Sequence, residues 1–171
     1  MHVRFCVGVW GVIPISTREK AIKGAKDYDK AASKYVQFLT GKDQADWSLV
    51  VLQNQALAQG DAYKNFYKTD YKATTNDWKT NLQLPCSWTR QGFDFSIYTN
   101  VTMPWQSKYD SNVSAPNAPA NYNPVGLYRK SFKVTDDMKA ANGRVYLSFQ
   151  GVESSYYVYV NGKEVGQLQS T

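Results

Sequence analysis

The chain has 171 residues, 43% of them hydrophobic and 20% charged, which suits a globular domain with a real core and room for an appendage. Its net charge of +6 is divided into +4 over residues 1–80 and +2 over residues 81–171. Because no basic run falls on a recognisable nucleic-acid motif, the charge indicates a solvated basic surface rather than a nucleic-acid site. No stretch approaches the roughly 20 apolar residues that span a bilayer.

The N-terminal part is predicted to be a leader followed by a helix. An apolar run over residues 5–15 has the length of an export signal, but it has no clear cleavage site. Over residues 16–39 apolar side chains recur at helical spacing, and Ser16 and Glu19 have the spacing of a capping box. Two isolated thiols, Cys6 and Cys86, indicate neither a metal site nor a disulfide framework.

Strand patterns begin after this part. Residues 46–52 are predicted to form a first strand, and a polar stretch up to residue 80 is predicted to be loop. Residues 106–124 contain three prolines and almost no aliphatic side chain, which is typical of a long loop.

The C-terminal third is predicted to be mainly β. The segments 127–134 and 144–149 are predicted to be strands, and in the second of them apolar and polar side chains alternate. The segment 156–160 is followed by Asn161-Gly162, which predicts a hairpin returning over residues 163–166. Such strands favour an antiparallel sandwich or jelly roll.

The segment IYTNVTMPW, residues 97–105, is the strongest candidate for ligand contact. Asn100 can donate to one sugar hydroxyl and accept from another, and Tyr98, Val101 and Trp105 are residue types that line sugar subsites. The sequence also carries 25 aromatic residues (5 Trp, 13 Tyr and 7 Phe). The alternatives are a loop amide that bonds only backbone groups and aromatic rings that fill a core.

Several motifs in one order resemble the amino-terminal sugar-binding domain of glycoside hydrolase family 2 β-galactosidases. The densest is LPCSWTRQGFDFSIYTNVTMPW, residues 84–105, in which Pro85, Ser87 and Trp88 correspond to the family's P-S-x-W turn. The others are the G-F-D of residues 92–94, the N-P-x-G-x-Y of residues 123–128, the F-x-G-V-x-S of residues 149–154 and the V-N-G-x-x-V-G of residues 160–166. The resemblance covers roughly residues 46–171.

This resemblance implies a galactose-binding-like jelly roll or β-sandwich over residues 45–171, incomplete at its C-terminus. Residues 1–44 lie outside the resemblance, and their pattern predicts a leader and helical extension. It implies that Asn100, with Val101 beside it, extends into a catalytic barrel of the same full-length chain and bonds a galactosyl group. Tyr98 and Trp105 are the candidate sugar platforms.

The resemblance also limits the chemistry of this chain. The two glutamates of these retaining enzymes, expected about 5 to 5.5 Å apart, come from the barrel, so no catalytic residue is assigned and the chain alone is expected to be inactive. The resemblance allows a Mg²⁺ or Na⁺ requirement of the full-length enzyme but assigns no metal ligand or other cofactor here. The implied partners are a β-galactoside, the barrel and further copies of a bacterial enzyme, cytoplasmic or secreted, with no nucleic acid or membrane.

Three alternatives stay open from the sequence. A free-standing carbohydrate-binding module would also have a β pattern and many aromatic residues. The equivalent domain of a β-glucuronidase or β-mannosidase shares the expected architecture. A structural interaction domain would use the basic helix predicted over residues 17–39.

Overall fold

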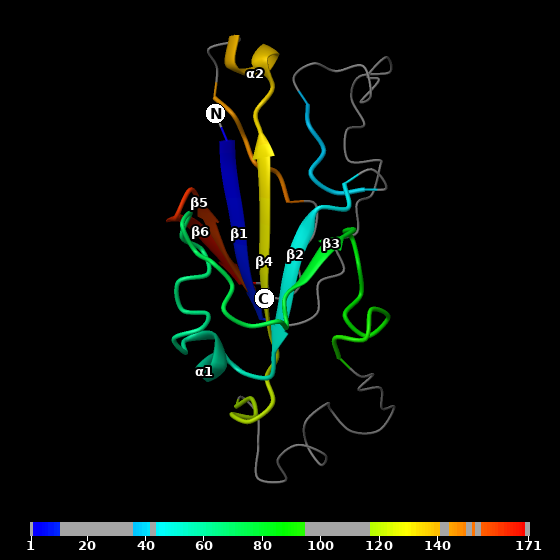
Figure 1. Cartoon of the computed structure of the whole chain (residues 1–171), viewed down its shortest axis with the longest axis vertical. Coiled ribbons are helices and arrows are strands. Elements are labelled where there is room, and N and C mark those ends of the chain that lie inside the picture. The colour runs from blue at the N-terminus through cyan, green and yellow to red at the C-terminus, as the bar shows by residue number, and fades with distance from the viewer. Residues whose placement is uncertain are drawn as a thin grey trace.

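The computed structural model of the protein describes residues 2–10, 36–41, 44–94, 117–140, 144–149, 152 and 155–169. Its centre is one six-stranded sheet in the order β3-β2-β4-β1-β5-β6 (Figure 1). All neighbouring strands are antiparallel. The elements are β1 (His2–Trp10), β2 (Trp47–Leu52), α1 (Gln55–Ala58), β3 (Lys79–Leu82), β4 (Val125–Lys133), α2 (Asp136–Ala140), β5 (Ser155–Val160) and β6 (Lys163–Gln169).

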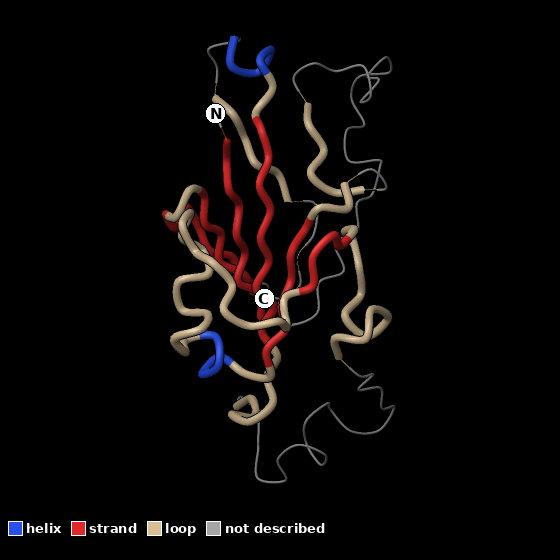
Figure 2. The backbone as a smooth tube through the Cα atoms, in the orientation of Figure 1, coloured by secondary structure: helices blue, strands red, loops and turns tan. Residues whose placement is uncertain are grey.

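The expected mainly β, antiparallel fold is confirmed, and the sheet is consistent with one layer of a sandwich. The two helices of the described residues are short and lie outside the sheet, α2 at the top of the view and α1 in its lower half (Figure 2). The strands predicted over residues 46–52, 127–134 and 156–160 are present as β2, β4 and β5. The hairpin at Asn161-Gly162 is also present, and both residues have the positive φ that such a turn requires, 52° and 82°.

Strand β1 corrects the expectation for the start of the chain. Residues 2–10 were expected to belong to a leader, but they form a strand between β4 and β5, with Cα partners from His2↔Lys133 to Trp10↔Val125 on one side. A short apolar run has the same composition in an export signal and in a strand with two neighbours. The expected boundary at residues 44/45 therefore does not separate residues 2–10 from the sheet.

Two further sequence predictions need correction. Most of the helix predicted over residues 16–39 lies outside the described residues, but residues 36–39 are irregular rather than helical. Residues 144–149 do not form the predicted strand, and Val145 and Tyr146 are 59% and 81% exposed. An alternating pattern forms a strand only where a neighbouring backbone supplies hydrogen bonds, and no described strand pairs with this segment.

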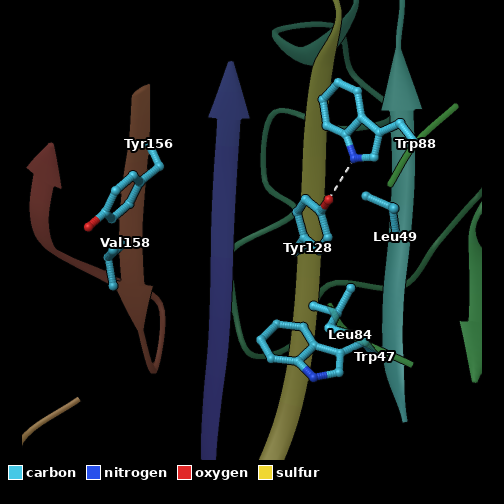
Figure 3. Close-up of a cluster of buried hydrophobic side chains, with 7 residues drawn as sticks. All are labelled: Trp47, Leu49, Leu84, Trp88, Tyr128, Tyr156 and Val158. Atoms are coloured by element: carbon cyan, nitrogen blue, oxygen red, sulfur yellow. Dashed lines mark hydrogen bonds between the residues drawn. The ribbon is translucent and has the colours of Figure 1, made fainter. Parts of the chain in front are cut away.

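The sheet carries a hydrophobic cluster on each face because successive side chains of a strand point to opposite sides. From β4, Tyr128 joins the first cluster, whereas Val125 and Leu127 join the second. The first cluster consists of Trp47, Leu49, Leu84, Trp88, Tyr128, Tyr156 and Val158 (Figure 3). The second consists of Val50, Leu52, Tyr63, Phe66, Val125 and Leu127.

Candidate functional site

The four residues predicted to contact sugar lie outside the described residues. Asn100, Val101, Tyr98 and Trp105 all belong to the stretch 95–116, which falls between the described residues Asp94 and Asn117. The structure therefore does not bring them together or place them apart. It does describe the two segments from which this stretch leaves and to which it returns.

Before the stretch, the chain is anchored by Trp88. This side chain is 0% exposed, and its indole Nε1 donates a hydrogen bond to the Tyr128 hydroxyl at 2.6 Å (Figure 3). Gly126 makes room for the ring, since a Cβ atom at this position would lie 2.5 Å from Trp88 Cζ2. Trp88 is therefore a core residue.

Burial also sets the chemistry of this anchor. It raises the pKa of Tyr128 far above its ordinary value, despite the opposing effect of the hydrogen bond from Trp88. The phenol therefore stays protonated and accepts the indole N–H with an oxygen lone pair. The pair satisfies a polar group that would otherwise be buried without a partner.

A compact turn leads from Trp88 to the start of the stretch. The Phe93 amide donates to the Trp88 carbonyl at 2.9 Å, and the Gln91 amide donates to the Ser87 carbonyl at 3.1 Å. Gly92 has a φ of +75°, a conformation that glycine adopts without steric penalty. Phe93 packs against the first cluster, so the chain reaches Asp94 from a fixed direction.

The returning segment is anchored next to the end of β2. The Asn123 amide donates to the Gln53 carbonyl at 2.8 Å, and the Asn54 side-chain amide donates to the Asn121 carbonyl at 3.4 Å. Pro119 is fully buried. The two anchored segments also contact each other directly, because the Tyr122 hydroxyl donates a hydrogen bond to Asp94 Oδ1.

On the second face, aromatic rings hold the long connection between α1 and β3. Tyr67 stacks on Tyr159 with ring centroids 4.6 Å apart. The Arg129 guanidinium donates to the Phe66 carbonyl and lies 4.9 Å from the centre of the Tyr71 ring. These rings contact parts of the same chain, which indicates a packing role rather than a sugar platform.

The first face carries a buried cation. Lys130 is 3% exposed, and its ammonium donates to the Asp46 carboxylate and, at 3.2 Å, to Gln44 Oε1. The same ammonium lies 5.6 Å from the centre of the Trp47 ring. Because a buried charge requires partners, this group ties residues 44–46 to β4.

The described residues contain no group of three or more His, Cys, Asp or Glu side chains that could hold a metal ion. Cys86 is a free thiol, and burial raises its pKa to about 11, which makes it a poor nucleophile. Among the helices of the described part, none is long and apolar enough to cross a membrane.

Comparison with known proteins gives one consistent result. The model of the family described as "Glycosyl hydrolases family 2, sugar binding domain" matches residues 51–171. The β-galactosidase of Priestia megaterium is 37% identical over 160 residues, which cover 94% of this chain and 14% of that protein. Those of Clostridium acetobutylicum and Streptococcus thermophilus are 34% and 31% identical, over 79% and 89% of this chain.

The chain thus spans about one seventh of the length of these relatives, at 13% to 14% of each. No solved structure matches it.

Proposed function

The chain belongs to the family 2 glycosyl hydrolases through their sugar binding domain, and on that premise we propose that it is the amino-terminal domain of a β-galactosidase. The observation that carries this proposal is the 37% identity to the Priestia megaterium β-galactosidase over 94% of the chain. The reaction would be hydrolysis of terminal β-D-galactosyl residues, with both catalytic carboxyl groups supplied by a barrel outside these residues. The finer fold proposed with it is a jelly roll, of which the six strands form one layer.

In this function the domain positions substrate and breaks no bond. Asn100, with Val101 beside it, would contribute a side-chain amide that donates to one galactosyl hydroxyl and accepts from another. Tyr98 and Trp105 would supply apolar surface for the sugar ring. Support comes from the structure on either side of these residues, where the Trp88 turn and the anchor at Gln53 provide a firm base.

A chimeric enzyme tests the proposal. The matching segment of the Priestia megaterium β-galactosidase is replaced by all 171 residues of this chain, and hydrolysis of a galactoside is measured. We expect the chimera to be active. A soluble chimera with the parent's size and secondary structure but no galactosidase activity would contradict the proposal.

The role of Asn100 is tested in the same chimera. Asn100→Ala should lower kcat/KM about fivefold or more, since a net hydrogen bond is worth on the order of 1 kcal/mol and an unpaired buried hydroxyl adds to the loss. The matched control is Asn117→Ala, which removes an exposed amide and should leave kcat/KM unchanged. Equal kinetics of the two variants would remove Asn100 from the site.

A further inference from the structure

The turn between β5 and β6 consists of Asn161 and Gly162, which both have positive φ, 52° and 82°. Asparagine and glycine adopt this conformation at lower cost than most other residues. The strands pair directly beside the turn, where Val160 is the Cα partner of Lys163. The backbone of this hairpin therefore favours Asn-Gly at its turn.

The same two residues can react with each other. The backbone nitrogen of Gly162 attacks Cγ of Asn161, and no side chain at position 162 shields that nitrogen. A bond forms between these two atoms, and the bond from Cγ to Nδ2 breaks. The Nδ2 group leaves as ammonia with the proton of the Gly162 amide, and a succinimide ring remains. Solvent water then opens the ring at one of its two carbonyls, which gives aspartate or isoaspartate.

The surroundings of the turn leave room for this ring to close. Asn161 is exposed. The atoms nearest to a Cβ built at Gly162 are Lys68 Cα and Thr69 N, both at 3.8 Å, which is ordinary van der Waals contact. Both turn residues lie outside the paired strands, so their torsions can change through a local opening of small free energy.

We propose that Asn161 is a site of spontaneous deamidation in the folded domain, and that its isoaspartate product loosens the β5–β6 hairpin. This inference is independent of the proposed function. An aspartate at position 161 adds a charge at an exposed place and tolerates positive φ. Isoaspartate instead adds one carbon to the backbone of the turn, and the length of a hairpin turn sets the register of its strands.

The disturbance would reach the second cluster through Tyr159. This residue pairs with Glu164 two positions before Asn161. Its ring stacks on Tyr67 with centroids 4.6 Å apart and meets Phe66 edge-on at 5.9 Å. A shifted register at the turn therefore displaces a ring that holds the connection between α1 and β3.

The experiment uses the whole 171-residue chain with Asn142→Gln, which removes the other Asn-Gly of the sequence. The chain is incubated in mildly alkaline buffer, folded or in urea, and tryptic peptides are analysed by mass spectrometry with isoaspartyl methyltransferase labelling. Asn161 lies in the peptide of residues 145–163. The internal control is Asn81, which is also exposed and has a φ of 58° but precedes Leu82.

We expect Asn161 in the folded chain to convert within about tenfold of its rate in urea, because the turn opens locally. Asn81 should stay intact over the same period, since the side chain of Leu82 shields the attacking nitrogen. The deamidated fraction, separated by charge, is compared with freshly prepared Asn161→Asp, which has the same charge without the extra carbon. Its urea midpoint should lie about 0.5 M lower than that of Asn161→Asp.

Three results would overturn the inference. Conversion of Asn161 in urea but not in the folded chain would show that the hairpin protects its turn. Equal conversion of Asn81 and Asn161 would show that the missing side chain at Gly162 is not what permits the reaction. Equal urea midpoints for the deamidated fraction and Asn161→Asp would show that the extra backbone carbon leaves the hairpin intact.

Discussion

Replacing Gly126 by alanine should destabilise the domain, chiefly through a clash with Trp88. The added Cβ would lie 2.5 Å from Trp88 Cζ2, 3.0 Å from Tyr128 Cε2 and 3.2 Å from Trp88 Cη2, whereas carbon atoms pack at about 3.5–4.0 Å. The ring cannot move away easily, because Trp88 is fully buried and its Nε1 is hydrogen-bonded to Tyr128 at 2.6 Å. Overpacking of this kind costs about 1–3 kcal/mol of unfolding free energy.

Urea unfolding of the 171-residue chain, followed by circular dichroism, measures this loss. With a slope of about 2 kcal/mol per molar urea, a loss of about 2 kcal/mol lowers the midpoint by about 1 M. The matched control is Gly166→Ala in β6, where nothing lies within 4 Å of an added Cβ. This control should be neutral or stabilising by about 0.5 kcal/mol, since alanine restricts the unfolded chain more than glycine.

A second variant connects the loss to the tryptophan ring. In a Trp88→Phe background the atoms Cζ2 and Cη2 are absent, so Gly126→Ala should cost less there than in the parent. The reasoning is refuted if Gly126→Ala is as stable as the parent, or if its cost is the same in both backgrounds. Either result would mean that the close approach of Trp88 to β4 is not what excludes a side chain at Gly126.

Three further predictions concern titration, reactivity and binding. Burial would raise the pKa of Asp77, but hydrogen bonds from Thr75 and Tyr63 outweigh it and hold this pKa below its ordinary value. The free energy of unfolding that ionised Asp77 contributes is therefore present above about pH 4 and lost as pH falls through the lowered pKa. Over that pH range the urea midpoint of the parent should fall more steeply than that of Asp77→Asn. Equal slopes of urea midpoint against pH for the two proteins would contradict this. With a pKa of about 11, native Cys86 should react with a thiol reagent at neutral pH far more slowly than in urea, and equal rates would contradict its burial. Calorimetric titration of the chain alone with galactose or lactose should give no heat of binding, because the proposed site needs the barrel; millimolar or tighter binding would instead support a free-standing sugar-binding module.

Local patterns predicted β2, β4 and the β5–β6 hairpin but neither β1 nor β3. The Asn161-Gly162 turn specifies its own conformation, and the hairpin follows. Residues 144–149 have a clear alternation of apolar and polar side chains, yet no described strand pairs with them. Residues 2–10 form a strand that the sequence did not predict, because a short apolar run has the same composition in a leader and in a strand.

Of the candidate site, the structure describes the supports on either side of residues 95–116, and the sequence indicated only some of these supports. Trp88 could be interpreted as a core residue because large aromatic side chains in β domains usually fill the core. Tyr122 gave no such signal, since its partner Asp94 is 28 positions away and no period connects them. The contact depends on how the Trp88 turn and the end of β2 meet, which is a property of the fold as a whole.

The structure gives the family resemblance a physical reason at one point. The family's turn motif supplies Trp88, and its N-P-x-G-x-Y motif supplies both the space at Gly126 and the acceptor at Tyr128. The two motifs therefore form one packed unit, in which each depends on the other. A side chain at Gly126 would displace the Trp88 ring, and a smaller ring at position 88 would leave a cavity. This unit lies on both sides of the stretch 95–116 in sequence, so exchanging one motif for an unrelated segment should disturb the packed support of that stretch even though residues 95–116 are unchanged.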